Sequence, residues 1–362
     1  MKAHPELVAL GFWMRRANLD NLRNRFQQSA AGATFHPKGT AFHIAPSNVD
    51  SIFIYSWFLS MLCGNKNIVR LSSRSSPQLG LLISALGELL EQDEWRAIAK
   101  RVLLVRYEHD ADISTYFSSL CDVRVIWGGN LTVSAIRNLP LPPHACEVAF
   151  ADKFSLALIH AKNWNNAADS KRQDWLNQFF NDAYWFGQMA CSSPRMIVWH
   201  GDKEAITTAQ ESFWHGVSKL LKQRETNILP VDFVNKLVAA DLIAIRLPTA
   251  VIHGSEHNDI CRVEIRHDYA KQLIDAELHC GAGLFFETSI GALDDLLPML
   301  DRRIQTVSYA GYPDGAELRE FAGCHVLRGV DRIVPFGKAL EFSSIWDGFD
   351  LFRIFLRQVS IV

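Results

Sequence analysis

Residues Phe42 to Leu71 read FHIAPSNVDSIFIYSWFLSMLCGNKNIVRL, which contains a turn, a helix and a strand in succession. The turn is the segment Pro46 to Asn48. It leads into the apolar run Ile52 to Cys63, whose length and preceding acidic and hydroxyl residues favour a buried helix capped at its start. Gly64 and the asparagine after it end that helix. The segment Ile68 to Leu71 is predicted to be the next strand.

The same alternation continues through the first half of the chain. Helices of this length between strands predict a parallel sheet with helices on its faces. We expect an amphipathic opening helix over Glu6 to Gln27, strands over Val102 to Tyr107 and Val123 to Trp127, and helices over Ala111 to Leu120 and Leu131 to Asn138.

A proline cluster at positions 140, 142 and 143 interrupts the pattern, and the very apolar strand Phe154 to His160 resumes it. We place a domain boundary near residue 154. The second half is predicted to contain helices over Ser170 to Gln188, Lys203 to Gln223 and Leu293 to Arg303, and strands over Met196 to His200, Leu242 to Arg246, Arg262 to Arg266, Leu284 to Glu287 and Gln305 to Tyr309.

The composition limits the class of protein. The 362 residues are enough for about two domains, and 48% hydrophobic with 21% charged residues exclude a disordered chain. Lys and Arg number 37 against 39 Asp and Glu, so the net charge of −2 does not suggest nucleic acid or an anionic membrane as partner. The longest uncharged stretch, Ser51 to Asn65, is too short to span a bilayer, and the amino terminus lacks a signal-peptide pattern. We expect a cytoplasmic protein without a transmembrane segment.

The sequence gives little support for a metal site. Its seven cysteines, an odd number without a CxxC pair, argue against a disulfide framework and a structural zinc site. The string His253 to His257 spells H-x-x-E-H, which binds zinc when a helix brings both imidazoles to one face. Here it contains Gly254 and Ser255 and runs into Asn258 and Asp259, which are turn residues. We interpret it as a solvated loop and predict no bound metal.

Three segments could carry chemistry, and each has a plainer alternative. Gly128 and Gly129, between a strand and a helix, could let backbone amides approach a phosphate, or could form an ordinary turn. Cys191 lies at an element boundary among small residues, where it could be exposed to a cleft or could be one more buried thiol. Asn48, in the turn before the apolar helix, could donate to an oxyanion or could make a simple Asx turn.

Taken together and in order, these segments resemble the aldehyde dehydrogenase superfamily, and more closely its fatty acyl-CoA reductase branch, the LuxC family. The resemblance implies an α/β, aldehyde-dehydrogenase-like fold with a Rossmann-type cofactor domain and an α/β catalytic domain. The family is usually longer at its amino terminus, so the resemblance implies a short form without that extension. Eight strings carry it across about residues 10 to 357: FHIAPSNVDS (Phe42 to Ser51), LCGNKNIVRLSSRSSP (Leu62 to Pro77), VRVIWGGN (Val123 to Asn130), ADKFSLALI (Ala151 to Ile159), GQMACSSPR (Gly187 to Arg195), IQTVSYAG (Ile304 to Gly311), DRIVPFGKAL (Asp331 to Leu340) and WDG (Trp346 to Gly348).

The resemblance implies roles for particular residues. Cys191 takes the place of the nucleophile that accepts the acyl group as a thioester. Asn48 takes the place of the asparagine that donates, with the backbone N–H of the cysteine, to the oxyanion. Arg70 stands where the superfamily has a lysine that reaches the adenosine ribose. Gly128 and Gly129 lie where the turn that faces the pyrophosphate begins.

The residues that activate water in hydrolytic aldehyde dehydrogenases are changed in this chain. Those enzymes need a glutamate in a segment that reads roughly E-L-G-G-K, and the matching segment here, Ala149 to Lys153, begins with alanine. An acyl-enzyme without that base would be slow to hydrolyse. Glu147, two residues earlier and on the same face of an extended segment, remains a candidate substitute. A one-residue shift between Gln188 and Cys191 also matches the reductase branch.

The segment after Arg70 bears on the choice of cofactor. Many NAD-dependent members have a glutamate there that binds the ribose hydroxyls, whereas this chain has Ser72 and Arg74. Arg74 would accommodate a 2′-phosphate through a charge-assisted contact, or could be a plain surface charge. We expect Arg70, Ser72 and Arg74 to bind NADPH, in preference to NADH.

The resemblance divides the chain into a nicotinamide cofactor-binding domain over residues 1–154, a thioester-forming catalytic domain over residues 155–340, and a C-terminal helical segment over residues 341–362 that packs back on the cofactor domain. The expected reaction is NADPH-dependent reduction of an acyl thioester, on CoA or on a protein carrier, to an aldehyde. The alternatives are an NAD(P)+-dependent aldehyde dehydrogenase and a non-catalytic scaffold for an acyl-activating partner. An acyl-protein synthetase partner is implied by the resemblance only, and a homo-oligomer is left open.

Overall fold

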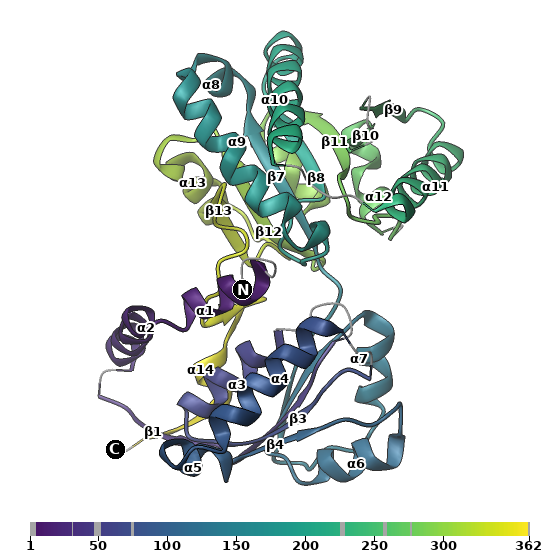
Figure 1. Ribbon diagram of the computed structural model, residues 1–362. Helices are drawn as coiled ribbons and strands as arrows, with labels where there is room; N and C mark the ends of the chain where they lie inside the picture. Colours follow the sequence, from purple (N-terminus) through teal and green to yellow (C-terminus); the bar gives the residue numbers. More distant parts are fainter. Residues whose placement is uncertain are drawn as a thin grey trace. The chain divides into compact units, whose positions relative to one another are not determined.

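The structure is a computed structural model that describes residues 5–30, 32–46, 52–73, 76–224, 229–255, 259–275 and 277–360. The chain divides into two compact units (Figure 1). Met1–Asp152 with Phe342–Val362 form the first unit, and Lys153–Glu341 form the second.

A five-stranded parallel sheet in the order β4-β3-β2-β5-β6 forms the centre of the first unit. The chain adds β3 and β4 on one side of β2 and then β5 and β6 on the other, so its direction of travel reverses between β2 and β5. Open α/β sheets bind ligands outside the carboxyl ends of the strands at such a reversal. The strands are β2 (Thr40–Ile44), β3 (Lys66–Arg70), β4 (Val102–Val105), β5 (Val123–Trp127) and β6 (Cys146–Phe150).

Helices cover this sheet, and α3 is the most deeply buried of them. Its residues Ile52 to Ser60 are all buried, which confirms the predicted apolar helix. The helices of this unit before residue 342 are α1 (Pro5–Trp13), α2 (Arg16–Ser29), α3 (Ile52–Leu62), α4 (Pro77–Leu90), η1 (Asp93–Trp95), α5 (Arg96–Ala99), α6 (Ala111–Ser119) and α7 (Asn130–Arg137).

The prediction of one opening helix over Glu6 to Gln27 is wrong, because α1 and α2 are separate helices. Arg15 between them is extended, with φ −62° and ψ 146°. The chain turns where Trp13 enters the core. Its ring lies 5.3 Å from that of Tyr55 and 5.6 Å from that of Phe58, measured between centroids. Burial of this large aromatic side chain fixes the position at which α1 ends.

Residues 342–360 complete the first unit and do not form the single helix expected over 341–362. Phe342 and Trp346 pack against Tyr55, with ring centroids 5.3 and 5.5 Å away. The segment contains β14 (Ile345–Trp346), β15 (Phe349–Asp350), α14 (Leu351–Phe355) and β16 (Leu356–Val359), which pairs antiparallel with β1 (Thr34–Pro37).

The second unit contains a seven-stranded sheet in the order β13-β12-β7-β8-β11-β10-β9. All neighbours are parallel except β9, an edge strand that pairs antiparallel with β10. The strands are β7 (Phe154–His160), β8 (Met196–His200), β9 (Val251–Gly254), β10 (Cys261–Glu264), β11 (Leu284–Ile290), β12 (Ile304–Ala310) and β13 (Arg332–Pro335). These positions confirm four of the five strands predicted between residues 196 and 309.

The fifth predicted strand, Leu242 to Arg246, is wrong because these residues end helix α11. Ala239, Ile243 and Leu247 recur every fourth residue and are buried together against the sheet. The helix predicted over Leu293 to Arg303 is the shorter 3-10 helix η4. The helices are α8 (Ala161–Asn166), α9 (Asp169–Tyr184), η2 (Trp185–Gln188), α10 (Lys203–Gln223), α11 (Pro230–Arg246), η3 (His267–Tyr269), α12 (Ala270–Asp275), η4 (Leu293–Met299), η5 (Pro313–Gly315) and α13 (Ala316–Cys324).

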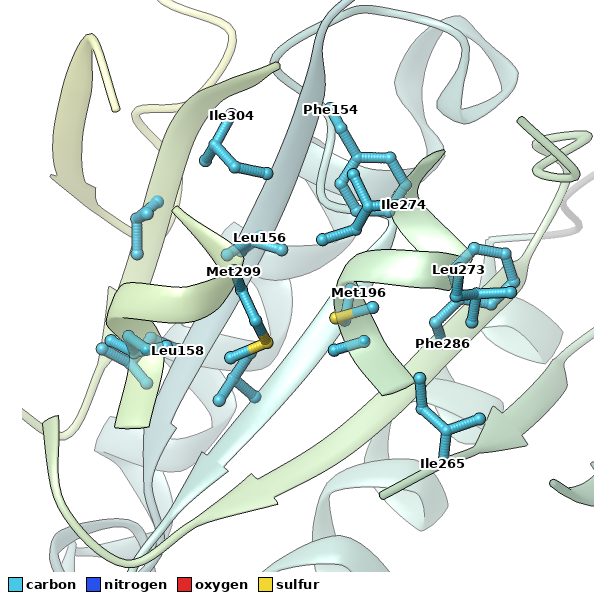
Figure 2. Packing of buried hydrophobic residues seen from close by; sticks show 14 of the residues in the cluster. Phe154, Leu156, Leu158, Met196, Ile265, Leu273, Ile274, Phe286, Met299 and Ile304 are labelled. Atoms are coloured by element: carbon cyan, nitrogen blue, oxygen red, sulfur yellow. The ribbon is translucent and has the colours of Figure 1, made fainter. Parts of the chain in front are cut away.

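The second sheet is buried on both faces, as parallel sheets require. On one face Leu156, Leu158 and Met196 pack with side chains of α12 and η4, including Leu273 and Met299 (Figure 2). The alternate residues of the same strands pack against α9 and α10 on the opposite face. A hydrophobic cluster on each face of the second sheet therefore holds its strands in place.

A buried polar network lies beneath α3 in the first unit. His43, fully buried in β2, places Nδ1 3.0 Å from Ser56 Oγ and Nε2 3.1 Å from Asn67 Oδ1. Trp127 Nε1 donates to the same Ser56 hydroxyl at 3.1 Å. Burial lowers the pKa of His43 to about 4, against the opposing effect of the Asn67 hydrogen bond. His43 is therefore a neutral structural group at pH 7.

Acidification should destabilise the first unit through His43. The unfolded chain takes up a proton near pH 6.5 and the folded chain only near pH 4, so stability is lost as the pH falls through this window. From pH 7 to pH 5 this residue alone should lower the free energy of unfolding by about 2 kcal/mol. Urea unfolding of His43→Gln should show a pH dependence smaller by that amount, whereas exposed His144→Gln should match the wild type. Equal pH dependence in His43→Gln and wild type would contradict this assignment.

Candidate functional site

Cys191 lies in a tight turn between η2 and β8, at the edge of the second sheet where its parallel strands begin. The thiol-bearing residue is partly exposed. Ser155 Oγ, at the start of β7, donates to the backbone oxygen of Cys191 at 2.6 Å and accepts from Thr306 N at 3.2 Å. The turn is closed by Ser193 N donating to Ala190 O at 3.0 Å. Two strands therefore fix the backbone on which the candidate nucleophile sits.

The three residues at the end of η2 have left-handed backbone conformations. Phe186, Gly187 and Gln188 have φ values of 59°, 57° and 64°. Such a conformation costs about 1–3 kcal/mol for a residue with a side chain and persists only where the surroundings enforce it. This strain lies three residues before Cys191, so the surrounding contacts must be strong.

The side-chain amide of Gln188 supplies those contacts. It is fully buried, and Nε2 donates to Pro194 O and to Leu284 O, both at 3.0 Å. Its Oε1 accepts from Gly283 N at 2.9 Å. One amide thus joins the residues before and after the Cys191 turn to the start of β11. The one-residue shift in the sequence left the role of Gln188 open, and the geometry makes it the residue that positions the turn.

The segment before β11 must contain glycine to approach the backbones of η2 and of Asp259 as closely as it does. At Gly283, φ is +87° and a Cβ would lie 2.2 Å from Asp259 O. At Gly281, φ is +78° and a Cβ would lie 2.6 Å from Gly187 O. Between them Ala282 N donates to Gly187 O at 2.9 Å. No larger residue fits at either glycine without moving backbone.

Asp182 forms hydrogen bonds with two of the sequence strings, Gly187 to Arg195 and Asp331 to Leu340. Ser193 Oγ donates to the backbone oxygen of Asp182 at 2.8 Å. The Asp182 carboxylate accepts from Gly337 N at 2.7 Å and from Ala339 N at 3.2 Å. Burial raises the pKa of this carboxyl to about 7, and the two backbone donors oppose the shift. The segment after Cys191 and the segment Asp331 to Leu340 are thereby held together.

His279 lies in the same loop before β11, close enough to Arg195 for that charge to affect its pKa. Its Nε2 faces Leu284 O at 2.8 Å, and its Nδ1 accepts from Gly281 N at 3.1 Å. Burial lowers its pKa well below the usual range, and nearby Arg195 acts in the same direction. Both ring nitrogens are engaged with backbone groups, so the ring is a neutral structural element and not a free base.

In the first unit, Arg70 ends β3 at the carboxyl edge of the sheet. Its guanidinium carbon lies 4.9 Å from the centroid of the Tyr107 ring, and Nη2 donates to the backbone oxygens of Tyr107 and Glu108 at 3.4 Å. The side chain is 6% exposed, and its Nε has no hydrogen-bond partner within the described parts of the chain. Ser72, two residues on, is also buried. The edge therefore carries a buried positive charge with an unused donor.

Gly128 and Gly129 follow β5 on the same edge, with β2 between β5 and the strand that Arg70 ends. A Cβ on Gly128 would lie 2.9 Å from Thr132, and Gly129 is the N-cap of α7. The Asp152 carboxylate accepts from Asn130 N at 2.9 Å. An anion thus already occupies the helix amino end that the sequence suggested for pyrophosphate. The glycines have a packing role in this structure.

Two predicted site residues, Asn48 and Arg74, lie outside the described residues. The candidate substitute base Glu147 is described, and its carboxylate pairs with Arg124 at 2.6 Å and with Arg137 at 2.9 Å. It also lies near the beginning of β6, at the amino edge of the sheet. Because guanidinium groups engage both of its oxygens, Glu147 is not a free base. The side chain of Ala149 has no group that could act as a base.

The structure gives no support to a metal site at the H-x-x-E-H string. His253 and Gly254 are in the extended strand β9, and His253 Nε2 lies 3.3 Å from Glu264 Oε2 on β10. Glu256 and His257 lie outside the described residues. Among the described residues, no three His, Cys, Asp or Glu side chains are placed to hold a metal ion. Across the same residues, no helix is long and apolar enough to cross a membrane.

Solved structures of aldehyde dehydrogenases share this fold. They include AldH of Staphylococcus aureus (TM-score 0.62, 12% identity, 90% of this chain and 72% of that one). A Sinorhizobium meliloti protein assigned as a methylmalonate-semialdehyde dehydrogenase, in complex with NAD, gives a TM-score of 0.63 at 14% identity over 91% and 70%. Betaine aldehyde dehydrogenase of S. aureus gives 0.64 at 10% identity over 90% and 68%. These likenesses confirm the predicted α/β, aldehyde-dehydrogenase-like fold.

The family is narrower than the fold. The model of the acyl-CoA reductase (LuxC) family matches residues 14–357. This chain therefore belongs to the LuxC acyl-CoA reductase family, as the eight sequence strings predicted, and is an oxidoreductase of that family. A search of curated individual proteins gave no match.

Removing the Gln188 amide should loosen the Cys191 turn. We expect Gln188→Ala to lower the free energy of unfolding of the second unit by about 2–4 kcal/mol, because three buried groups lose their partner. Urea denaturation followed by tryptophan fluorescence measures this. Gln173→Ala, an exposed glutamine on α9, is the matched control and should change stability by less than about 0.5 kcal/mol. A Gln188→Ala protein as stable as the control would remove Gln188 from this role.

Proposed function

We propose that this protein reduces an activated acyl thioester, carried by CoA or by a protein, to an aldehyde with NADPH, through a thioester on Cys191. Family membership across residues 14–357 supports acyl-CoA reduction. The observation that carries the assignment to Cys191 is its partly exposed position in a strained turn that buried Ser155 and Gln188 hold from two sides. A cysteine with only a packing role would not need such a turn.

The chemistry begins at the Cys191 thiolate. A free thiol has a pKa of about 8.5, so only a few per cent is thiolate at pH 7 and the site must favour deprotonation. The sulfur attacks the acyl carbonyl carbon, a C–S bond forms, and the carrier leaves as its thiol after gaining a proton. When bound, the nicotinamide cofactor supplies a hydride to the thioester carbon. The resulting thiohemiacetal on Cys191 collapses by breaking the C–S bond, which releases the aldehyde and restores the thiolate.

Charge develops twice on the acyl oxygen during this sequence. We assign its stabilisation to the side-chain amide of Asn48 and the backbone N–H of Cys191, since preorganised donors aimed at a developing oxyanion are strongly stabilising. The hydrogen bond from Ser155 to the Cys191 oxygen fixes the peptide plane on one side of that residue. Asn48 follows β2, the strand at which the first sheet reverses direction.

The acyl-enzyme must resist water until reduction occurs. Ala149 takes the place of the hydrolytic glutamate, and the two guanidinium groups of Arg124 and Arg137 occupy the nearest alternative, Glu147. This favours aldehyde formation over release of a carboxylic acid. The competing assignment as an aldehyde-oxidising dehydrogenase lacks its base at this position.

The first unit fits an anionic cofactor at one point and conflicts with it at another. Arg70 offers a buried guanidinium at the carboxyl edge of the sheet, whose Nε lacks a partner within the described part of the chain. We assign the adenosine end of the cofactor to Arg70, Ser72 and Arg74. A pyrophosphate at Gly129 would have to displace the Asp152 carboxylate from the amino end of α7.

On this assignment the first unit is the cofactor domain and the second is the catalytic domain. An acyl-protein synthetase is the proposed source of a protein-carried acyl group.

Acyl transfer should depend on one cysteine. Incubation with radioactive acyl-CoA in the absence of NADPH should label the wild type, and Cys191→Ala and Cys191→Ser should abolish stable thioester labelling. Cys324→Ala, an exposed cysteine in the same unit, is the matched control and should label fully. Undiminished thioester labelling of Cys191→Ala would place the nucleophile elsewhere.

The preference for NADPH should depend on Arg74. Replacing it by alanine removes a charge-assisted contact to the 2′-phosphate, so the Kd for NADPH should rise about 10- to 100-fold while that for NADH changes little. A fluorescence titration with both cofactors measures this. Lys100→Ala removes an exposed positive charge before β4, at the opposite edge of the sheet, and should leave both affinities unchanged. Equal weakening of NADPH and NADH by Arg74→Ala would contradict a 2′-phosphate contact.

A further inference from the structure

The second unit contains a basic cleft of about 950 Å³, lined by residues of α12, of η4 and the turn after it, and of the segment after α13. Four of the residues that line it carry a positive charge: Lys271, Arg302, Arg303 and Arg328. One, Asp301, is acidic. Pockets for small organic ligands range from about 300 to 1,000 Å³, so this cleft has room for a molecule much larger than a single inorganic anion.

A tight turn after η4 places Arg302 at the cleft. Arg303 N donates to Asp301 Oδ1 at 2.9 Å, and Ile304 N donates to Asp301 O at 3.0 Å. Met299 and Ile304, labelled in Figure 2, are buried on either side of this turn. The core therefore fixes the position of the turn while the side chain of Arg302 stays exposed.

A second exposed arginine, Arg328, reaches the same turn because a glycine follows it. A Cβ at Gly329 would lie 1.6 Å from Asp301 O. Only glycine lets the backbone pass this close to the turn, since any side chain would collide with it. Arg302 and Arg328 are thereby brought to one cleft from separate parts of the chain.

Neighbouring carboxylates pair with the other two positive charges of the cleft. Lys271 pairs with Asp301 and, at 3.6 Å, with Asp275. Arg303 pairs with Glu277 at 3.3 Å and with Asp275 at 3.8 Å. These ion pairs hold the walls of the cleft together and leave Lys271 and Arg303 with little charge for a ligand.

The guanidinium groups of Arg302 and Arg328 differ from these, because no carboxylate pairs with them. Within the described parts of the chain, neither side chain forms an ion pair or a hydrogen bond. A guanidinium presents a planar fork of N–H donors that matches the oxygens of a phosphate group. The cleft therefore offers two such forks to a ligand with phosphate groups.

One wall of the cleft is apolar and consists of Leu297, Pro298 and Leu300. An inorganic anion gains nothing from such a wall, whereas a ligand with an aromatic base buries apolar surface against it. The volume, the two guanidinium groups and the apolar wall together fit a phosphorylated nucleotide.

The cleft lies next to the strand that holds the Cys191 turn. Arg303 O accepts from Phe154 N at 2.7 Å, and the next residue, Ser155, donates its Oγ to Cys191 O at 2.6 Å. These contacts put the Cys191 backbone on the order of 10 Å from the arginine turn. The arm of CoA joins its sulfur to its pyrophosphate by about 13 bonds, and an extended chain advances about 1.2 Å per bond, so the arm reaches about 15 Å. This length matches the separation of Cys191 from the cleft.

We infer that this cleft binds the nucleotide end of CoA, with its phosphates against Arg302 and Arg328 and its adenine against the apolar wall. The inference rests on the proposed function for the thioester at Cys191, and it makes CoA, and not a carrier protein, the carrier of the acyl group. The phosphopantetheine arm of a carrier protein has one phosphate and no adenine, so it would leave most of the cleft empty.

Isothermal titration calorimetry with adenosine 3′,5′-bisphosphate, the nucleotide part of CoA without its arm, tests the cleft without any reaction at Cys191. Arg302→Ala and Arg328→Ala should each raise the Kd about tenfold, and the double variant about 100-fold. Arg319→Ala removes an exposed arginine of α13 that does not line the cleft, and should keep the wild-type Kd. No binding by the wild type, or wild-type affinity in both cleft variants, would overturn the inference.

A parallel titration with NADPH separates the two nucleotides that the reaction uses. The Kd for NADPH should be the same in Arg302→Ala, Arg328→Ala and the wild type. A loss of NADPH affinity together with unchanged affinity for the bisphosphate would assign the cleft to the cofactor and overturn its assignment to CoA.

Steady-state kinetics connect the cleft to catalysis. The ratio of kcat/KM for acyl-CoA to kcat/KM for the same acyl group on pantetheine, which has no nucleotide, should fall about tenfold in Arg302→Ala and in Arg328→Ala. Arg319→Ala should keep the wild-type ratio. An unchanged ratio in the cleft variants would contradict the inference, because a merely structural effect lowers both values equally. A protein that reduces neither substrate would refute the proposed function, whereas the bisphosphate titration would still report on the cleft.

Discussion

The buried amide of Gln188 is the interaction on which the candidate active site depends. It makes three hydrogen bonds, to Pro194, Gly283 and Leu284, and these hold a strained left-handed backbone three residues before Cys191. Leaving a buried amide without hydrogen-bond partners costs free energy. The turn cannot relax without breaking these three hydrogen bonds, so that cost opposes its relaxation. The position of the sulfur is thereby set by the same core that holds β8 and β11 together.

The first unit shows a different constraint, in which charge decides what the sheet edge can bind. Arg70 is buried at this edge beside the ring of Tyr107, and its Nε has no hydrogen-bond partner among the residues that the structure describes. Asp152 places a carboxylate on the amino end of α7, which follows β5 at the reversal of the sheet. A phosphate-bearing ligand is attracted by the first group and repelled by the second. On the proposed assignment, the Arg70 guanidinium at the end of β3 therefore favours cofactor binding more than the glycine turn does.

The sequence predicted the alternation of helices and strands and the family, because buried strands and βα turns have local signatures. It failed at Leu242 to Arg246, where a short continuous apolar run is compatible with a strand or a helix and reveals its helical period only together with the residues from Pro230. It could not predict the role of Gln188, whose partners include residues 95 and 96 positions away. It also offered Glu147 as a base, since the two arginines that engage this carboxylate come from separate elements.

We propose that the acyl group on Cys191 leaves as an aldehyde by reduction and not as an acid by hydrolysis. A single-turnover experiment tests this most directly. Enzyme is acylated with radioactive acyl-CoA, freed of CoA by gel filtration, and then mixed with NADPH or with buffer alone. We expect one equivalent of labelled aldehyde per acyl-enzyme with NADPH, and slow loss of label in buffer. Release of labelled carboxylic acid as the main product under both conditions would contradict it.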